Sequence, residues 1–95
     1  MLDPNGYPTE ETLEKIRTWS DNWESLLDLC KEIWHYPEFF HKFEYEKAIL
    51  YSTATGGWSG NEDIICALQE NLPFWEDCWQ AGKRGGIFEF EVKKG

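Results

Sequence analysis

The chain has few basic residues, no paired cysteines and no long apolar run. Nine lysines and arginines stand against eighteen aspartates and glutamates, which gives a formal net charge of -9 over 95 residues. Because affinity for phosphate backbones and anionic lipids comes from lysine and arginine, this balance argues against direct nucleic-acid binding and against anionic membranes. It is compatible with binding to a basic protein surface, and also with an acidic surface that only keeps the protein soluble.

The three cysteines and two histidines form no disulfide or metal-binding pattern. Cys30, Cys66 and Cys78 are odd in number and have no Cys-x-x-Cys spacing, and neither His35 nor His41 has a metal-ligand spacing to them. We therefore expect no metal site and no cofactor. We also expect three buried free thiols on the apolar sides of helices, in a reducing compartment.

The remaining absences concern targeting segments and domain boundaries. The first residues do not have the pattern of a signal peptide, and no apolar run approaches the roughly 20 residues of a membrane-spanning helix. We therefore expect a cytoplasmic protein, and the length predicts a single domain over residues 1–95. Residues 1–8 are expected to be an irregular lead-in and residues 93–95 a polar tail.

Periodic apolar residues predict two helices in the first third of the chain. Thr9 is placed to cap a helix that ends near Trp19, and Ser20 is placed to cap the next one. The second helix is the clearest element, because its apolar residues recur at helical spacing until Pro37 ends it. These apolar residues are Trp23, Leu26, Leu27, Cys30, Ile33 and Trp34.

Two further helices are expected in the second half of the chain. One runs from about residue 60 to residue 71, with its apolar residues turned inward. The other begins at Pro73, which suits a first helical turn, and ends at Gly82. Its apolar face is formed by Phe74, Trp75, Cys78 and Trp79.

Two segments have the patterns of strands. Residues 48–53 are apolar on both faces at their centre, which is typical of an interior strand whose faces are both at least partly covered. Residues 88–92 alternate apolar residues with glutamate, which is typical of a half-buried strand. Residues 39–47 are compatible with a strand, a hairpin or part of a helix. The order predicts an α+β fold, with a small antiparallel sheet of two or three strands and about four helices packed mainly on one face.

The most informative stretch follows the first expected strand and contains three glycines around Trp58. Gly56 and Gly57 permit a turn with positive φ, and Ser59 with Glu62 has the spacing of a helix-opening capping box. A second glycine junction, Arg84-Gly85-Gly86, opens the last strand. If the two strands pair antiparallel, the two glycine junctions become neighbours at one end of the sheet.

These junctions carry groups suited to a small anionic ligand that contains a ring. A helix N-terminus presents free N–H groups, Trp58 can stack on a base, and Arg84 can bind a phosphate bidentately. Asn61 can read a base edge or a hydroxyl. The candidate ligand-binding residues are Gly56, Gly57, Trp58, Ser59, Asn61 and Arg84. The alternative is purely structural: a glycine-rich turn, a capped helix and a tryptophan in the core.

Catalytic signatures are missing from the sequence. It has no serine–histidine–acid arrangement, no His-Glu-x-x-His, no nucleophile elbow and no phosphate-binding loop of the GxxxxGK[ST] type. Its many carboxylates are expected on exposed helix faces. We therefore expect no catalytic residues and no enzymatic activity.

Several of these motifs together resemble a group of small uncharacterised phage and prophage proteins. The likeness rests on the run from Ser52 to Ile65, on Phe74-Trp75 with Trp79, and on Arg84-Gly85-Gly86 followed by Phe88-Glu89-Phe90. The start from Tyr7 to Ile16 also resembles theirs, so the likeness covers most of the chain. The resemblance implies a phage origin and a small accessory role such as countering host defence, and it assigns no reaction.

Three functions are therefore open. The first is a non-enzymatic protein in the host cytoplasm that sequesters a nucleotide-like host immune signal, with a second copy in a homodimer as a way to complete the site. The second is an acidic, anti-CRISPR-like inhibitor that binds a host defence protein. Its candidate contact residues are Glu10, Glu14, Asp21, Glu24 and Asp28, which also suit a merely solvated face. The third is a virion or scaffold component.

Overall fold

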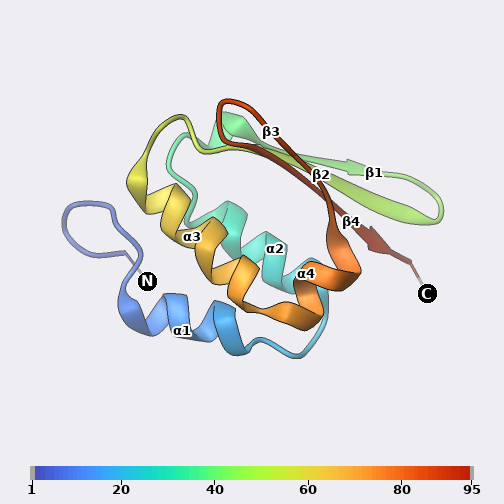
Figure 1. Ribbon diagram of the computed structural model, residues 1–95, viewed down its shortest axis with the longest axis horizontal. Helices are drawn as coiled ribbons and strands as arrows, with labels where there is room; N and C mark the ends of the chain where they lie inside the picture. Colours follow the sequence, from blue (N-terminus) through green and yellow to red (C-terminus); the bar gives the residue numbers. More distant parts are fainter. Residues whose placement is uncertain (1, 95) are drawn as a thin grey trace.

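The computed structural model describes residues 2–94 as one antiparallel sheet with its helices on one face (Figure 1). The helices are α1 (Glu10–Thr18), α2 (Trp23–Glu32), α3 (Ser59–Glu70) and α4 (Leu72–Cys78), with a short 3-10 helix, η1 (Pro37–Phe39). The strands are β1 (Phe40–Glu44), β2 (Ala48–Ala54), β3 (Trp79–Lys83) and β4 (Ile87–Lys93), in the sheet order β1-β2-β4-β3. The expected α+β class is confirmed, whereas the sheet has four strands instead of two or three.

The two edge strands account for this difference. β1 forms within residues 39–47, for which the sequence is compatible with a strand, a hairpin or part of a helix. Its inward-facing Lys42 interrupts the apolar pattern of a strand. The helix expected to reach Gly82 ends at Cys78, and the chain continues directly into β3. Trp79 therefore lies exposed on an edge strand, stacked on Trp75 with 5.7 Å between ring centroids, instead of completing a helix face.

The first two helices start on side-chain caps, one of them at a different residue than expected. Thr9 caps α1 as expected, because its hydroxyl accepts a hydrogen bond from the Thr12 N–H at 3.2 Å. The cap of α2 is Asn22 and not Ser20, since the Asn22 side chain accepts a hydrogen bond from the Ser25 N–H at 3.0 Å. Both helices therefore begin on a side-chain oxygen that serves an otherwise unpaired amide.

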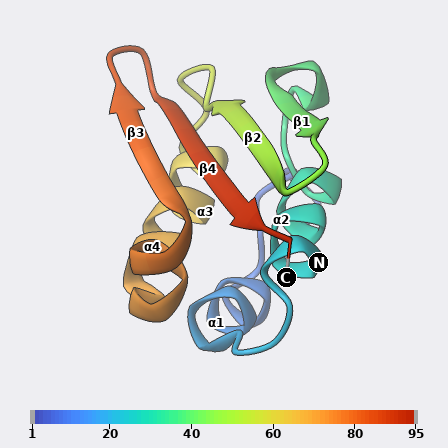
Figure 2. The ribbon, with the colours of Figure 1, turned by 90° about the vertical axis from the view of Figure 1, so that its right-hand side faces the viewer.

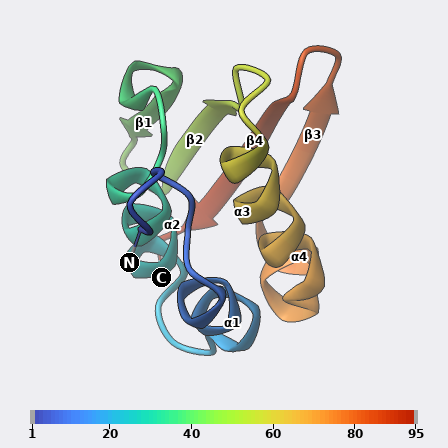
Figure 3. The same cartoon turned by 90° about the vertical axis from the view of Figure 1, so that its left-hand side faces the viewer.

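The core lies between the helices and one face of the sheet (Figures 2 and 3). Ile49 and Tyr51 of β2 point into it and are buried together with Phe90 of β4. Leu50 points to the other face and is 36% exposed. The inner face of this strand is therefore buried, and its outer face is only partly covered and carries no described helix.

The N-terminal segment is held by a bridge and by hydrogen bonds. Leu2 pairs with Pro8 in an antiparallel bridge, and the Asp3 carboxylate accepts hydrogen bonds from the backbone N–H groups of Asn5 and Tyr7, at 2.9 Å each. The expected lead-in is thus a closed turn, while Met1 and Gly95 lie outside the described residues. Among residues 2–94, every helix is too short or too polar to cross a membrane.

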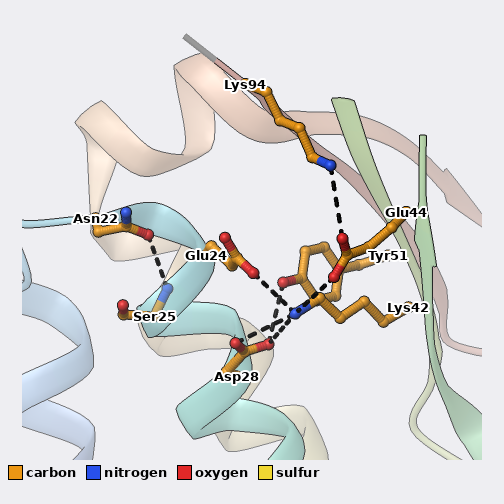
Figure 4. A network of polar contacts seen from close by, with 8 residues as sticks. All are labelled: Asn22, Glu24, Ser25, Asp28, Lys42, Glu44, Tyr51 and Lys94. Carbon is orange, nitrogen blue, oxygen red and sulfur yellow. Dashed lines mark hydrogen bonds and ion pairs between the residues drawn. The ribbon is translucent and has the colours of Figure 1, made fainter. Parts of the chain in front are cut away.

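Lys42 ties the edge strand β1 to helix α2 (Figure 4). Its ammonium lies 2.9 Å from the Glu24 carboxylate and 3.2 Å from that of Asp28, and the Tyr51 hydroxyl donates to Asp28 at 3.1 Å. The hydrogen bond with Glu24 is the main reason that the pKa of Lys42 is raised. Two acidic residues of α2 are therefore engaged in intramolecular ion pairs.

The cysteines differ in their surroundings. Cys30 and Cys78 are buried, as expected, and burial raises the pKa of each thiol to about 12. Cys66 is exposed on α3, so the expectation of three buried thiols is wrong. Ile64, Ile65 and Leu68 form the inward side of α3, and Cys66 lies outside that apolar stripe.

The buried thiols predict a loss of stability at alkaline pH. Because the pKa of Cys30 is higher in the folded than in the unfolded chain, its stabilising effect is complete below pH 9 and declines as the pH rises toward 12. Between pH 8 and pH 10 we expect the free energy of unfolding to fall by roughly 1 kcal/mol through this thiol alone. Urea unfolding at both pH values measures it. Cys30→Ala should make the dependence shallower and Cys66→Ala should not; equal slopes in all three proteins would contradict the prediction.

Candidate functional site

The two glycine junctions meet at one end of the sheet, as antiparallel pairing predicted. β2 and β4 pair with Ala54 opposite Ile87, and just beyond them the Thr55 N–H donates to the Gly86 carbonyl at 3.1 Å. β1 begins at the same end, since Phe40 lies opposite Thr53. We call the three connections gathered here, residues 34–39, 55–58 and 84–86, the loop end (Figure 3).

Unusual backbone conformations concentrate at the loop end. It contains five of the six residues with positive φ that the structure describes, namely Tyr36, Gly56, Gly57, Gly85 and Gly86. The Trp58 N–H donates to the Thr55 carbonyl at 3.1 Å, which closes a tight turn over the first glycine pair. The turn with positive φ that was expected at Gly56 and Gly57 is confirmed, and unusual backbone conformations of this kind cluster at functional sites.

Tyr36 is the residue with positive φ that is not glycine. Its φ of 64° is costly for a bulky side chain, and its ring lies against the glycine turn. A Cβ at Gly56 would lie only 2.9 Å from the Tyr36 ring and 3.3 Å from the Phe39 ring. The two residues are 38% and 40% exposed, so two partly exposed aromatic side chains flank the turn. Sequence reasoning did not single out either residue.

Asn61 holds the loop end together from α3. Its side chain is 1% exposed, and its carbonyl oxygen accepts a hydrogen bond from the His35 N–H at 2.9 Å. Its NH₂ group donates to the carbonyls of His35, at 2.7 Å, and Thr55, at 3.1 Å. With both amide hydrogens used on backbone, Asn61 positions two loops and has no free donor for a base edge.

Trp58 is also engaged within the protein. It is the N-cap residue of α3, and its indole stacks on Tyr7 and on His35 with centroid distances of 4.8 and 4.4 Å. A Cβ at Gly60 would lie 2.7 Å from the indole nitrogen, so glycine is required beneath the ring. Stacking on a ligand, as the sequence suggested, would compete with Tyr7 and His35. The indole N–H is buried and has no hydrogen-bond partner among the described residues.

The capping box expected at the start of α3 is wrong. Ser59 is the first residue of the helix instead of its cap, so its side chain is one position too late to serve the orphan amides. The Ser59 hydroxyl instead donates to the Tyr7 hydroxyl at 3.1 Å. Glu62 does not reach back to the helix start and remains exposed.

Arg84 is the free cation of the loop end. It is exposed in the turn between β3 and β4, and no residue within 2–94 pairs with it. Its neighbour Lys83, in contrast, lies 3.5 Å from Glu89. The guanidinium is therefore available to a phosphate or a carboxylate from outside the molecule.

A hollow of about 190 Å³ opens beside the two glycine junctions, between α3 and β4. It is lined by Thr55, Glu62, Ile65, Cys66, Gln69, Gly86 and Phe88. This volume is below the range of pockets that enclose a whole ligand, so the hollow would hold only part of a nucleotide. The Glu62 carboxylate disfavours a phosphate in the hollow itself, which leaves Arg84 as the anchor for an anionic group.

Most of the acidic residues proposed for partner binding form ion pairs with basic residues of the same chain. Glu10 lies 2.7 Å and Glu14 3.6 Å from the Arg17 guanidinium, and the hydrogen bond with Glu10 raises the pKa of Arg17. Glu24 and Asp28 pair with Lys42. Asp21 is exposed and accepts a hydrogen bond from its neighbour's N–H at 2.8 Å.

Residues 2–94 contain no group of three or more histidine, cysteine, aspartate or glutamate side chains that could hold a metal ion. The groups found at the loop end are aromatic rings, glycine turns, one free guanidinium and a helix start. Comparison of the chain with protein-family models, with curated proteins and with solved structures found no match.

Proposed function

We propose that the chain is a non-enzymatic binding protein that captures a small, nucleotide-like molecule at the loop end. The observation that carries this proposal is the contact between the two glycine junctions, in which the Thr55 N–H donates to the Gly86 carbonyl. It brings the start of α3 and the turn that carries Arg84 to the same end of the sheet. The motif resemblance adds the biological setting, a phage accessory protein that sequesters a host immune signal.

The anionic part of the ligand would bind Arg84 and the first amides of α3. A guanidinium recognises phosphate bidentately, and a helix start offers unpaired N–H groups with a favourable dipole. Ser59, the first helical residue, adds a hydroxyl next to these amides. In this proposal Asn61 and Trp58 support the walls of the site and do not contact the ligand.

The ring of the ligand would lie on exposed aromatic surface or in the neighbouring hollow. Tyr36 and Phe39 flank the glycine turn, and Phe88 and Gly86 line the hollow of about 190 Å³. Because the hollow holds only part of a nucleotide, much of the ligand would stay exposed in a single chain. A second copy in a homodimer would cover that exposed side.

The test is calorimetric titration with AMP, cyclic di-AMP and cyclic GMP-AMP, followed by the variant Arg84→Gln. Loss of a charged hydrogen bond should weaken binding of the recognised nucleotide by about tenfold or more. Lys83→Gln is the matched control and should matter little, because it removes the same charge from the neighbouring residue, which belongs to β3 and not to the glycine turn. The proposal fails if no nucleotide binds, or if Arg84→Gln binds as tightly as Lys83→Gln.

The net charge favours a second function, an acidic inhibitor that docks on a basic surface of a host defence protein. Glu10 and Glu14 support it because their side chains are exposed despite their contacts with Arg17. In a reconstituted defence assay, Glu10→Lys with Glu14→Lys should abolish inhibition under this function, whereas Arg84→Gln should leave it intact. The reverse pattern would assign inhibition to ligand capture.

A further inference from the structure

The outer face of the sheet is a second candidate surface, on the side opposite the helices. We call it the open face; Figure 2 shows the four strands on this side with no helix over them, and the outward-facing residues of the strands form it. Phe43 and Leu50 lie opposite each other in the register of β1 and β2 and are 48% and 36% exposed. Tyr45, the residue that follows β1, is 56% exposed. Large apolar side chains thus cluster where no described element covers them.

A hollow of about 410 Å³ lies on this face, within the size range of binding pockets. Its walls combine apolar rings with a few polar groups, from Phe43, Tyr45, Leu50, Tyr51, Ser52, Gln80, Glu89 and Phe90. Glu89 supplies the only carboxylate of this lining. The hollow therefore pairs aromatic surface with one negative charge, and Ser52 and Gln80 add hydrogen-bonding groups.

Both edge strands of the sheet have features that disfavour pairing with an additional strand. β1 is short, and its inward-facing Lys42 would be buried by a neighbouring strand. β3 is equally short and has a register shift between Trp79 and Ala81. A partner is therefore more readily received on the face through its side chains than along an edge through its backbone.

We propose that the hollow of the open face is a docking site for a partner protein that inserts an arginine side chain flanked by apolar residues. The guanidinium would pair with Glu89 and stack on the rings of Phe43 and Tyr45. Lys83 is no obstacle, because it meets Glu89 only at 3.5 Å and both side chains are exposed. The net charge of -9 would steer a cationic partner toward the molecule and oppose a second copy of this chain.

The experiment is a titration of the ¹⁵N-labelled protein with the peptide N-acetyl-Leu-Arg-Phe-amide, monitored by amide chemical shifts. We expect saturable shifts at Leu50, Ser52, Gln80 and Glu89. The same peptide with citrulline in place of arginine has the same shape without the charge, and it should bind about three- to fivefold more weakly. Equal binding of the two peptides, or shifts confined to α1 and α2, would overturn the proposal.

Variants then separate this site from its surroundings and from the loop end. Glu89→Gln should weaken the binding of the arginine peptide by about three- to fivefold. Glu91→Gln, on the same face of the same strand but outside the lining, should leave its affinity unchanged. Arg84→Gln should also have no effect, so failure here is distinct from failure at the loop end. A further control raises the protein concentration without peptide. If the same shifts then appear, and vanish in Arg84→Gln, a second copy occupies the face and the proposal is overturned.

Discussion

Replacement of Asn61 by alanine should lower the free energy of unfolding by about 3 kcal/mol, because three backbone groups lose their partner. The His35 N–H and the carbonyls of His35 and Thr55 all depend on this buried side chain. For a domain of this size, the melting temperature should fall by roughly 12 °C or more. Differential scanning calorimetry measures both quantities.

Asn22→Ala is the matched control, since it removes the same side chain from an exposed helix cap. It should cost only about 1 kcal/mol. The prediction is contradicted if the two variants are equally stable. A second readout is the Tyr36 amide signal, which should broaden or shift in Asn61→Ala alone, because the adjacent His35 peptide is no longer held.

Replacement of Gly86 by alanine should be nearly as damaging and should act directly on the junction of the two loops. A Cβ at this position would overlap the Thr55 hydroxyl, and the φ of 74° is itself unfavourable for alanine. Strain and overpacking together should cost about 3 kcal/mol, measured by urea unfolding. Nucleotide binding at the loop end should weaken in parallel under the proposed function.

Gly85→Ala separates the two causes. Gly85 also has positive φ, at 86°, but a Cβ there would meet nothing within 4 Å. It should therefore cost only the backbone strain, about 1–2 kcal/mol. In Thr55→Ala combined with Gly86→Ala, part of the steric cost should be recovered, so the double-mutant cycle should show coupling. Additive effects would mean that the Thr55 contact is not the cause.

The helical part of the fold could be predicted because each helix carries its own apolar period. The edge strands could not, because their stability comes from partners elsewhere in the chain. Lys42 is tolerated on the inner side of β1 since α2 supplies Glu24 and Asp28. Trp79 continues the apolar spacing of α4, and only the pairing with Phe90 shows that it belongs to a strand.

At the loop end, the location was predictable and the roles of the residues were not. Antiparallel pairing of two recognisable strands is enough to place the glycine junctions side by side. The tasks of Trp58 and Asn61 depend on Tyr7 and His35, which are distant in sequence and carry no local signal for such contacts. The sequence predicts ligand-binding groups in Trp58 and Asn61, whereas the contacts of both residues hold the loops in place.

The strand order has a consequence for how the molecule acquires its structure. β2 and β4 are neighbours at the centre of the sheet, yet α3, α4 and β3 lie between them in the chain. The central ladder can form only after this long segment has closed on itself, which is an entropic barrier for the whole domain. Folding should therefore be limited by this closure, and the amides of β2 and β4 should be the slowest to exchange with solvent deuterium, because they open only with global unfolding.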